Sequence, residues 1–417
     1  MLDARGRRRA DVVVADGVIR AVGPDVLGDA PARARVLEAS GCVVAPGLVD
    51  LHAHLRQPGA EEAETVETGG RAAALGGYTA VVAMPNTDPP VDSAAVAREV
   101  LALGGRALVE VCVAGAITIG RAGKRLAPMG ELAALGVRLF TDDGAGVQDG
   151  ALMRRALDYA KGLGVTLAQH CEDDHLASAG AMHEGAWSSR LGLPGIPSAA
   201  EESMVARDIA LARLTGARVH FLHLSTAGSV ELVRRAKAEG LPVTAEAAPH
   251  HLVLTDASCA SYDACYKVNP PLRTETDVTA VRAGVLDGTI DAIATDHAPH
   301  LPEAKDVPFD DAPSGMLGLE TALAVALSVM DIAQALASLS WKPATIAGLS
   351  PRHGGPVEPG AAANLCVIDP ALSWTVDPVR LASRSRNTPF GGWTFMGRNR
   401  HTVSAGEAVV VDGEAQR

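Results

Sequence analysis

Two histidines, His52 and His54, stand two positions apart at the end of the apolar run 47–54. Side chains two positions apart on a strand point to the same side, so both imidazoles could reach one metal ion. The pair alone is weak support for a metal site, because two polar residues also occur together at ordinary strand ends. The prediction of a metal therefore depends on further ligands that the fold brings to the same place.

Imidazoles and carboxylates also follow the later apolar runs. These residues are Asp142, Asp143, His170, His223 and Asp296. Four histidines with two or three aspartates exceed the four ligands of a single zinc ion. They suit two metal ions that share a bridging carboxylate and activate a hydroxide between them. Because imidazole and carboxylate together favour zinc over magnesium or calcium, the sequence predicts a site for two Zn2+ ions.

The elements that must position these residues are eight repeats of an apolar run followed by a helical pattern. The runs cover residues 47–54, 78–86, 107–115, 137–144, 165–172, 218–225, 242–251 and 291–300. Several are continuously apolar, which is typical of strands buried on both faces. Helical patterns such as 93–104 and 151–164 lie between them. Eight such units predict an α/β fold, a (β/α)8 barrel over residues 47–356 with its active site at the carboxyl ends of the strands.

Both ends of the chain differ from the middle. Residues 1–46 and 357–417 alternate short valine-rich runs with Asp-Gly and Ala-Gly turns. This pattern is typical of antiparallel hairpins. We therefore expect the two ends to form one small β-sandwich domain beside the barrel.

The composition limits the classes of function. The chain has 417 residues and a net charge of −12, which argues against nucleic acid as a ligand because phosphates require a basic surface. No apolar run approaches the length of a transmembrane helix, and the first residues, MLDARGRRRADVVV, lack the apolar stretch of a signal peptide. The six cysteines are scattered without a CxxC pair, so we expect a cytoplasmic protein.

Several other histidines are not expected to bind metal. Those expected at the surface are His175, His183, His353 and His401. His220 lies three positions before His223, and regular alternation would place it on the opposite face of the strand. His250 and His251 end the seventh run, where they could support the metal ligands or serve structural roles.

Six segments carry a more specific pattern than the ligand types alone. They are DLHAHLRQPG (50–59), AMPNTDPP (83–90), FTDDG (140–144), HCEDD (170–174), VNPPLR (268–273) and IATDHAPH (293–300). Together they closely resemble the class I dihydroorotases of the amidohydrolase superfamily, over roughly residues 40–325 with a weaker echo at 386–397. The resemblance implies a zinc-dependent enzyme of pyrimidine (UMP) biosynthesis. Such an enzyme reversibly hydrolyses the cyclic amide of (S)-dihydroorotate to N-carbamoyl-L-aspartate.

The resemblance also implies a role for each metal-binding residue. The implied ligands are His52, His54, Asp143, His170, His223 and Asp296. Asp143 would bridge two zinc ions. The histidines of the first run would bind one ion together with Asp296, and those of the fifth and sixth runs would bind the other. Asp296 would also be the catalytic residue that transfers protons.

A second implied set binds the substrate. It consists of His54, Arg56, Asn86, Asn269, His300, Ser314 and Gly315. Arg56 would pair with the substrate carboxylate and so compensate for the negative net charge. The alternative for Arg56 is an ion pair with Glu61 or Glu62. Ser314 departs from the family pattern, because the tetrapeptide 312–315 reads APSG where many relatives have APFG.

Other functions of the same fold remain as alternatives. Many relatives bridge their metals with a carboxylated lysine on the fourth strand, and the run 137–144 contains no lysine. This argues against a hydantoinase, dihydropyrimidinase or allantoinase. A non-catalytic scaffold for aspartate transcarbamoylase is the other alternative, although the complete ligand set argues against it. The sequence leaves open a homodimer and an association of the active enzyme with aspartate transcarbamoylase.

Overall fold

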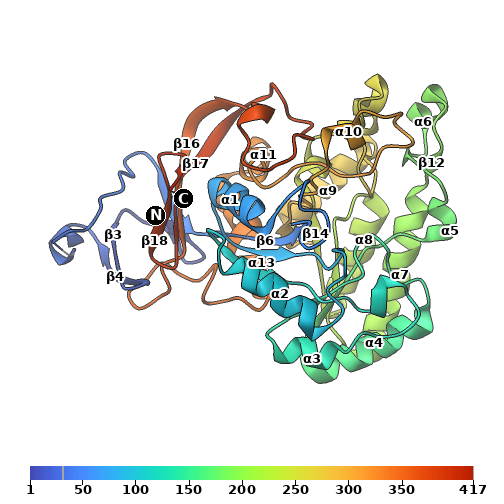
Figure 1. The fold of residues 1–417 in the computed structure, drawn as a ribbon, viewed down its shortest axis with the longest axis horizontal. Coiled ribbons are helices and arrows are strands. Elements are labelled where there is room, and N and C mark those ends of the chain that lie inside the picture. Colours follow the sequence, from blue (N-terminus) through green and yellow to red (C-terminus); the bar gives the residue numbers. More distant parts are fainter. Residues whose placement is uncertain (31, 417) are drawn as a thin grey trace.

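The structure is a computed structural model that describes residues 1–30 and 32–416. Figure 1 shows two parts side by side. The middle of the chain forms a barrel surrounded by helices, and both ends of the chain contribute to a layer of long β-strands.

Eight parallel strands form the barrel. They are β6 (Leu48–Ala53), β7 (Tyr78–Ala83), β8 (Glu110–Val113), β9 (Leu139–Phe140), β10 (Thr166–Gln169), β13 (Val219–Phe221), β14 (Val243–Ala247) and β15 (Ala292–Ile293). Pairing gives the orders β6-β7-β8 and β9-β10-β13-β14-β15. The parallel bridges Gly115–Phe140 and Ala53–His297 close the ring. Each strand lies within one of the eight apolar runs, which confirms the predicted (β/α)8 barrel.

Helices follow the strands and cover the outside of the barrel (Figure 1). The longer ones are α1 (Val66–Gly76), α2 (Ala94–Gly104), α4 (Gly150–Leu163), α7 (Ser198–Thr215), α8 (Ala227–Ala238), α9 (Glu275–Asp287) and α11 (Ala322–Val329). The predicted helical patterns 93–104 and 151–164 correspond to α2 and α4. Local sequence fixes where helices begin: the side chain of Asp149 caps α4 by accepting hydrogen bonds from the backbone N–H groups of Ala151 and Leu152.

Shorter elements complete the connections. The short helices are α3 (Met129–Ala134), α5 (Asp174–Ala177), α6 (Ala186–Leu191), α10 (Pro302–Lys305), α12 (Ile332–Leu336) and α13 (Lys342–Ile346). Turns of 3-10 helix cover Val26–Asp29, Ile119–Arg121, Pro249–Leu252, Asp256–Ser261, Ala264–Tyr266 and Pro378–Arg380, and a π turn covers Ala337–Trp341. The strands β11 (Met182–His183) and β12 (Gly195–Ile196) form a separate parallel pair.

The β-layer is an antiparallel sheet that combines segments from both ends of the chain. Its strands, in spatial order, are β19 (Glu414–Ala415), β18 (Glu407–Val411), β17 (Thr394–Ser404), β16 (Leu365–Thr375) and β5 (Val43–Pro46). Two N-terminal hairpins join this part, β1 (Leu2–Asp3) with β2 (Gly6–Arg7) and β3 (Asp11–Ala15) with β4 (Val18–Gly23). We propose residues 1–46 and 357–417 as one domain and residues 47–356 as the other.

The connection between β16 and β17, residues 376–393, leaves the sheet and packs against the barrel. Phe390 in this connection is 1% exposed. It belongs to the same apolar cluster as Phe309 and Met316, which follow β15 in the chain. The C-terminal part of the chain therefore reaches the region where the barrel strands end.

Aliphatic side chains and alanines fill the barrel. The central cluster of buried residues includes Val49, Leu51, Val82, Met84 and Leu222. With few aromatic residues in the chain, these side chains supply the apolar packing beneath the polar groups at the strand ends. Among the described residues, no helix is both long enough and apolar enough to cross a membrane.

Three histidines that the sequence placed at the surface are buried, so that prediction was wrong. They are His183, His353 and His401. His353 shows the physical reason, because its ring nitrogens find polar partners in Thr79 at 3.0 Å and Glu110 at 2.8 Å. Such partners come from distant parts of the chain and leave no local signal. His175 is exposed, as predicted.

Candidate active site

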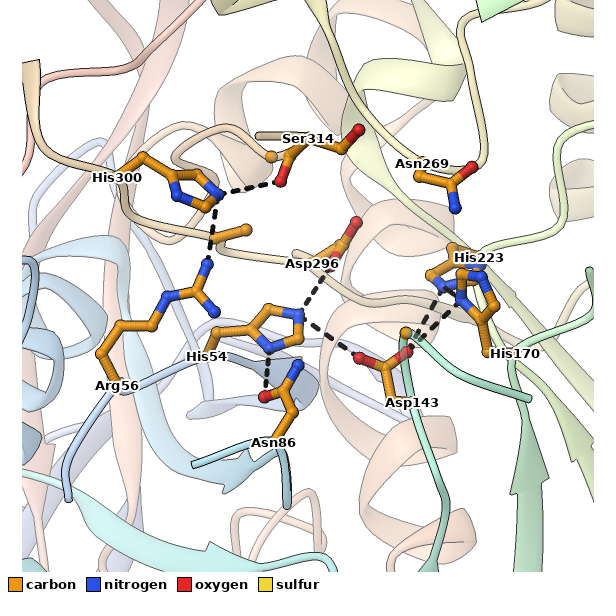
Figure 2. A pocket seen from close by; sticks show the side chains of 13 residues that line it. His54, Arg56, Asn86, Asp143, His170, His223, Asn269, Asp296, His300 and Ser314 are labelled. Atoms are coloured by element: carbon orange, nitrogen blue, oxygen red, sulfur yellow. Dashed lines mark hydrogen bonds and ion pairs between the residues drawn. The ribbon is translucent and has the colours of Figure 1, made fainter. Parts of the chain in front are cut away.

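The carboxyl ends of the barrel strands surround a cavity of about 240 Å³ (Figure 2). The cavity is lined by His54, Arg56, Asn86, Asp143, Gly144, His170, His223, Asn269, Asp296, Ala298, His300, Ser314 and Gly315. These include every residue predicted as a metal ligand or substrate contact except His52. His52 is completely buried and contacts the same carboxylates. The fold thus brings the whole predicted set to one place.

Strand β6 delivers His52 and His54 to the same region. Their ring centroids are 5.2 Å apart. His54 directly follows the strand, and its backbone N–H donates to the carbonyl oxygen of His297 at 2.8 Å. This bond ties the end of β6 to the end of β15. Because His52 and His54 are two positions apart, both imidazoles lie beside the carboxylates of Asp143 and Asp296.

The carboxylate of Asp143 lies between two sets of imidazoles (Figure 2). Its Oδ2 is 3.6 Å from Nε2 of His54. Its Oδ1 is 3.4 Å from Nε2 of His52 and 3.6 Å from both Nδ1 of His170 and Nε2 of His223. One carboxylate thus contacts imidazoles from both sets, an arrangement suited to a ligand that bridges two metal ions.

The neighbouring Asp142 has a different environment. Its Oδ1 accepts hydrogen bonds from the backbone N–H groups of Ile117 and Thr118 at 2.9 and 3.0 Å, and its Oδ2 accepts one from the Thr118 hydroxyl. Asp142 therefore holds the loop after β8. Of the two adjacent aspartates, Asp143 is the one that enters the cavity.

Three residues that line the cavity have backbone angles that are rare for residues other than glycine. The φ angles are 60° at Arg56, 29° at His223 and 47° at Asp296. Such conformations cost free energy and persist where the surrounding structure holds them, often at functional sites. Asp296 directs its Oδ1 to within 3.1 Å of Nε2 of His54 and 3.5 Å of Nε2 of His52.

The cluster fits bound cations. Buried side-chain atoms that lack a hydrogen-bond partner include Nε2 of His52, Oδ1 of Asp143 and Nε2 of His170. Buried polar atoms are rarely left unpaired, and a metal ion held by His52 and Asp143 would satisfy the first two. Burial alone would lower the pKa of His52, but the carboxylates of Asp143, Glu246 and Asp296 outweigh this effect and raise it well above its ordinary value. The cluster therefore attracts positive charge.

Two groups of ligand atoms lie close enough to hold an ion. One group is His52, Asp143 and His223, and the other is His52, His54 and Asp296, with all ligand atoms of each group within 4.8 Å of one another. The second group contains the residues predicted for one zinc ion. His170 lies outside both groups, with its Nδ1 3.0 Å from Nε2 of His223.

Glu246 on β14, which was not predicted from the sequence, is a buried carboxylate in contact with the cluster. Its Oε1 accepts from Nδ1 of His52 and its Oε2 accepts from Nε2 of His220, both at 2.9 Å. The prediction that His220 and His223 point to opposite faces was therefore wrong. Strand β13 ends at Phe221, and the positive φ of His223 breaks the alternation. His220 contacts Glu246 and His223 contacts Asp143, and both carboxylates contact His52.

Arg56 lines the cavity and, among the residues that the structure describes, has no carboxylate partner (Figure 2). Its Nε donates to the carbonyl oxygen of Pro299 at 3.1 Å, and a terminal nitrogen lies 3.3 Å from Nε2 of His300. His300 in turn donates from Nε2 to the carbonyl oxygen of Ser314 at 2.8 Å. Burial and the adjacent guanidinium lower the pKa of His300 to about 3, so this imidazole is neutral. The charge of Arg56 is available to an anionic ligand.

Two asparagines complete the polar lining. Oδ1 of Asn86 accepts from Nδ1 of His54 at 2.9 Å, which leaves Nε2 of His54 as the unprotonated nitrogen of a neutral ring. Nδ2 of Asn269 donates to Oε1 of Glu172 at 3.1 Å, while Oδ1 of Asn269 is buried without a partner. Asn86 thus leaves the lone pair of His54 Nε2 available to a cation, and Asn269 offers a free acceptor.

Gly315 allows two segments to approach closely at the cavity. Its φ is 139°. A Cβ atom at this position would lie 2.7 Å from Cβ of Ala298 and 2.9 Å from Nε2 of His300. Only glycine leaves room for this contact.

The family comparison agrees with the chemistry of this site. A family model described as Dihydro-orotase-like matches residues 41–229. The dihydroorotase of Pelotomaculum thermopropionicum is 52% identical over 408 residues, which cover 96% of this chain and 94% of that protein. The dihydroorotase of Streptomyces coelicolor is 50% identical and covers 98% of this chain and 97% of its own. The chain belongs to the dihydroorotase family.

The similarity within the dihydroorotase family extends along the whole chain. The dihydroorotase of Mycobacterium tuberculosis is 50% identical over 418 residues, covering 97% of this chain and 96% of that protein. Solved structures that match include a dihydropyrimidinase from Brevibacillus agri NCHU1002, with a TM-score of 0.86 and 23% identity over 100% of this chain and 94% of that chain. The L-hydantoinase from Arthrobacter aurescens has a TM-score of 0.86 and 24% identity, covering 100% and 95% of the two chains. At these identities, the similarity establishes a shared fold.

Proposed function

We propose that this chain is a zinc-dependent dihydroorotase that reversibly hydrolyses the cyclic amide of (S)-dihydroorotate to N-carbamoyl-L-aspartate in pyrimidine biosynthesis. The observation that carries the proposal is a single cavity that combines the imidazoles around Asp143 with the free guanidinium of Arg56. The first feature supports metal-assisted hydrolysis, and the second supports recognition of a carboxylate. Relatives named dihydroorotase, 50–52% identical over nearly the whole chain, support the same reaction.

We propose two Zn2+ ions at this site, with Asp143 as the bridging ligand. The proposed ligands are His52, His54, Asp143, His170, His223 and Asp296. The position of Asp143 between His54 and the pair His170 and His223 supports the bridging role. When bound, such a pair of ions lowers the pKa of a water molecule and polarises a carbonyl oxygen.

Asp296 is the proposed catalytic acid and base. Its carboxylate lines the cavity and contacts Nε2 of His54 at 3.1 Å. It accepts the proton of the attacking water while the new C–O bond forms at the ring carbonyl. It then donates that proton to the ring nitrogen while the C–N amide bond breaks. The same carboxylate serves the ring-closing direction with the two proton transfers reversed.

Arg56 is the proposed binding group for the substrate carboxylate. A guanidinium can form two parallel charge-assisted hydrogen bonds to a carboxylate, which suits an anionic substrate in a chain of net charge −12. Asn269, with its unpaired Oδ1, is the proposed acceptor for a ring N–H group. Proposed further contacts to the substrate come from His54, Asn86, His300, Ser314 and Gly315, which line the same cavity.

Substrate preference tests this assignment. Hydantoin and allantoin are cyclic amides without a carboxylate that could pair with Arg56. We expect kcat/KM for dihydroorotate to exceed those for hydantoin and allantoin by about 10- to 100-fold, since a lost hydrogen bond to a charged group costs about 1.5–3 kcal/mol. Equal or higher kcat/KM for either of the other substrates would replace the proposal by a different cyclic amidase.

We also propose a cytoplasmic location, supported by six cysteines that are all free among the described residues. Homodimer formation and association with aspartate transcarbamoylase are hypotheses about assembly. Size-exclusion chromatography of the chain, alone and mixed with aspartate transcarbamoylase, tests both: a dimer mass supports the first, and co-elution supports the second.

A further inference from the structure

A short C-terminal segment, residues 383–387, lies against the mouth of the barrel. It belongs to the connection between β16 and β17, whose flanking strands are part of the separate β-layer. Ser383 and Ser385 are buried in this segment. The hydroxyl of Ser385 donates to the carbonyl oxygen of Ala63 at 2.8 Å, and that of Ser383 donates to Oε2 of Glu64. The segment is therefore fixed to the loop that follows Arg56.

Asn387 ends this segment and is 4% exposed. Its Nδ2 donates to the carbonyl oxygens of Ala298 at 2.9 Å and Gly315 at 3.1 Å. Its Oδ1 accepts from the backbone N–H of His300 at 3.1 Å. Both amide protons and the amide oxygen are thus used, and all three partners are backbone groups of residues that line the cavity.

These three bonds join two segments that come from different parts of the barrel mouth. Ala298 and His300 follow β15, whereas Gly315 lies beyond α10. The carbonyl oxygen of Asn387 also accepts from the N–H of Leu317 at 3.1 Å. Asn387 therefore bonds to the backbone of the second segment at two residues, Gly315 and Leu317. Asn387 thus adds to the direct bonds between the two segments, which run from the N–H of Ala298 to the carbonyl oxygen of Met316 at 2.9 Å and from His300 to the carbonyl oxygen of Ser314 at 2.8 Å.

We propose that Asn387 is a positioning residue for substrate binding, because it holds His300 and Gly315 in place from outside the cavity. It does not line the cavity and acts only through the backbone of residues that do. This inference rests on the proposed function, in which the segment at His300 and Gly315 contacts the substrate beside Arg56. Through Asn387, the C-terminal part of the chain would help to shape the substrate-binding cavity.

A matched control separates positioning from general stability. Asn399 on β17 is also an asparagine buried to a similar degree, 3% exposed. Its Nδ2 donates to the Thr402 hydroxyl at 2.8 Å and to the carbonyl oxygens of Ala74 and Leu75 at 3.4 and 3.3 Å. These partners lie in the sheet and at the end of α1, and none lines the cavity. Loss of either asparagine side chain should lower the melting temperature, but only one should affect binding.

The experiment compares Asn387→Ala, the isosteric Asn387→Asp and Asn399→Ala with the parent chain. We expect both Asn387 variants to raise KM for dihydroorotate about tenfold or more, the effect of losing about 1.4 kcal/mol of binding free energy. The effect on kcat and on bound zinc should be much smaller. Asn399→Ala should keep the parent KM. Asn387→Asp retains the acceptor and the size, so it provides the kinetic comparison if the alanine variant does not fold.

Hydrogen–deuterium exchange provides a readout that needs no substrate. Exchange at peptides covering residues 298–300 and 314–317 should accelerate in Asn387→Ala and stay unchanged in Asn399→Ala. An unchanged KM with unchanged exchange would overturn the role of Asn387. Absence of turnover by the parent chain would instead contradict the proposed function, and in that case the exchange data alone decide whether Asn387 holds the two segments.

Discussion

Nδ1 of His52 donates a hydrogen bond of 2.9 Å to Oε1 of Glu246. Burial opposes ionisation of this glutamate, but hydrogen bonds from His220 and His52 lower the pKa of Glu246 to about 2. An ionised carboxylate only accepts, so the hydrogen of a neutral His52 ring resides on Nδ1 and its Nε2 keeps the lone pair that a metal ligand needs. Glu246 therefore orients His52 and selects its tautomer.

The variant Glu246→Gln tests this relationship. It removes the charge and leaves one of the two histidines without its acceptor. We expect the affinity for Zn2+ to fall by about 10- to 100-fold, the usual effect of changing a residue that supports a metal ligand. Competition between metal-free protein and a chromogenic chelator measures this affinity. Glu110→Gln is the control, because Glu110 contacts the buried His353 and takes no part in the ligand cluster. Equal zinc affinities for Glu246→Gln and the parent would refute the role of Glu246.

The variant Asp143→Ala tests the bridging carboxylate. Without it, the two sets of imidazoles lose their shared ligand, and bound zinc should fall from about two to about one ion or fewer per chain. Metal analysis of the dialysed protein measures the content. The adjacent Asp142→Asn is the control and should keep the parent zinc content, because Asp142 bonds the loop at Ile117 and Thr118. Retention of two zinc ions by Asp143→Ala would rule out the bridge.

Much of the barrel and its rim could be predicted from sequence because both follow from local patterns. Eight apolar runs of similar length specify buried parallel strands, and the barrel topology brings the polar residues at their ends together. For this reason residues as distant as His54 and Asp296, which contact at 3.1 Å, could be assigned to one site before any geometry was known.

The remaining features depend on backbone irregularities and long-range contacts. Regular alternation separates His220 from His223, but a φ of 29° at His223 overrides it. Glu246 did leave a signal, since a glutamate within an apolar run needs a buried partner. Asn387 left none, because its partners lie 72 to 89 positions away in the chain.

The variant Arg56→Met tests recognition of the substrate carboxylate. Methionine keeps much of the apolar stem and removes the charge, so KM for dihydroorotate should rise by about 10- to 100-fold, as expected for loss of a hydrogen bond to a charged group. Steady-state kinetics with zinc content measured in parallel checks this. Arg154→Met on the exposed surface of α4 is the control and should keep the parent KM. An unchanged KM for Arg56→Met would refute the contact.

Glu320, which is not among the proposed metal ligands, should make the stability of the chain depend on pH. Burial raises the pKa of Glu320 from its ordinary value of 4.5 to about 7. Between these values the folded chain binds more protons than the unfolded chain, so this residue lowers the free energy of unfolding as pH rises from about 4.5 to about 7. Glu320→Gln keeps an acceptor for the N–H of Ala382 and removes the ionisation. Its stability relative to the parent should therefore be greater at about pH 8 than at about pH 5, as measured by urea unfolding. If the free energies of unfolding of Glu320→Gln and the parent differed by the same amount at both pH values, the raised pKa of Glu320 would be contradicted.

The most direct test of the central claim is hydrolysis of dihydroorotate by the purified chain, with zinc determined on the same sample. We expect turnover with about two zinc ions per chain, loss of turnover on chelation and its return when Zn2+ is restored. Asp296→Ala should lose nearly all turnover while keeping much of its metal. A parent chain that binds zinc yet leaves dihydroorotate unchanged, or turns it over equally well without metal, would contradict a zinc-dependent dihydroorotase.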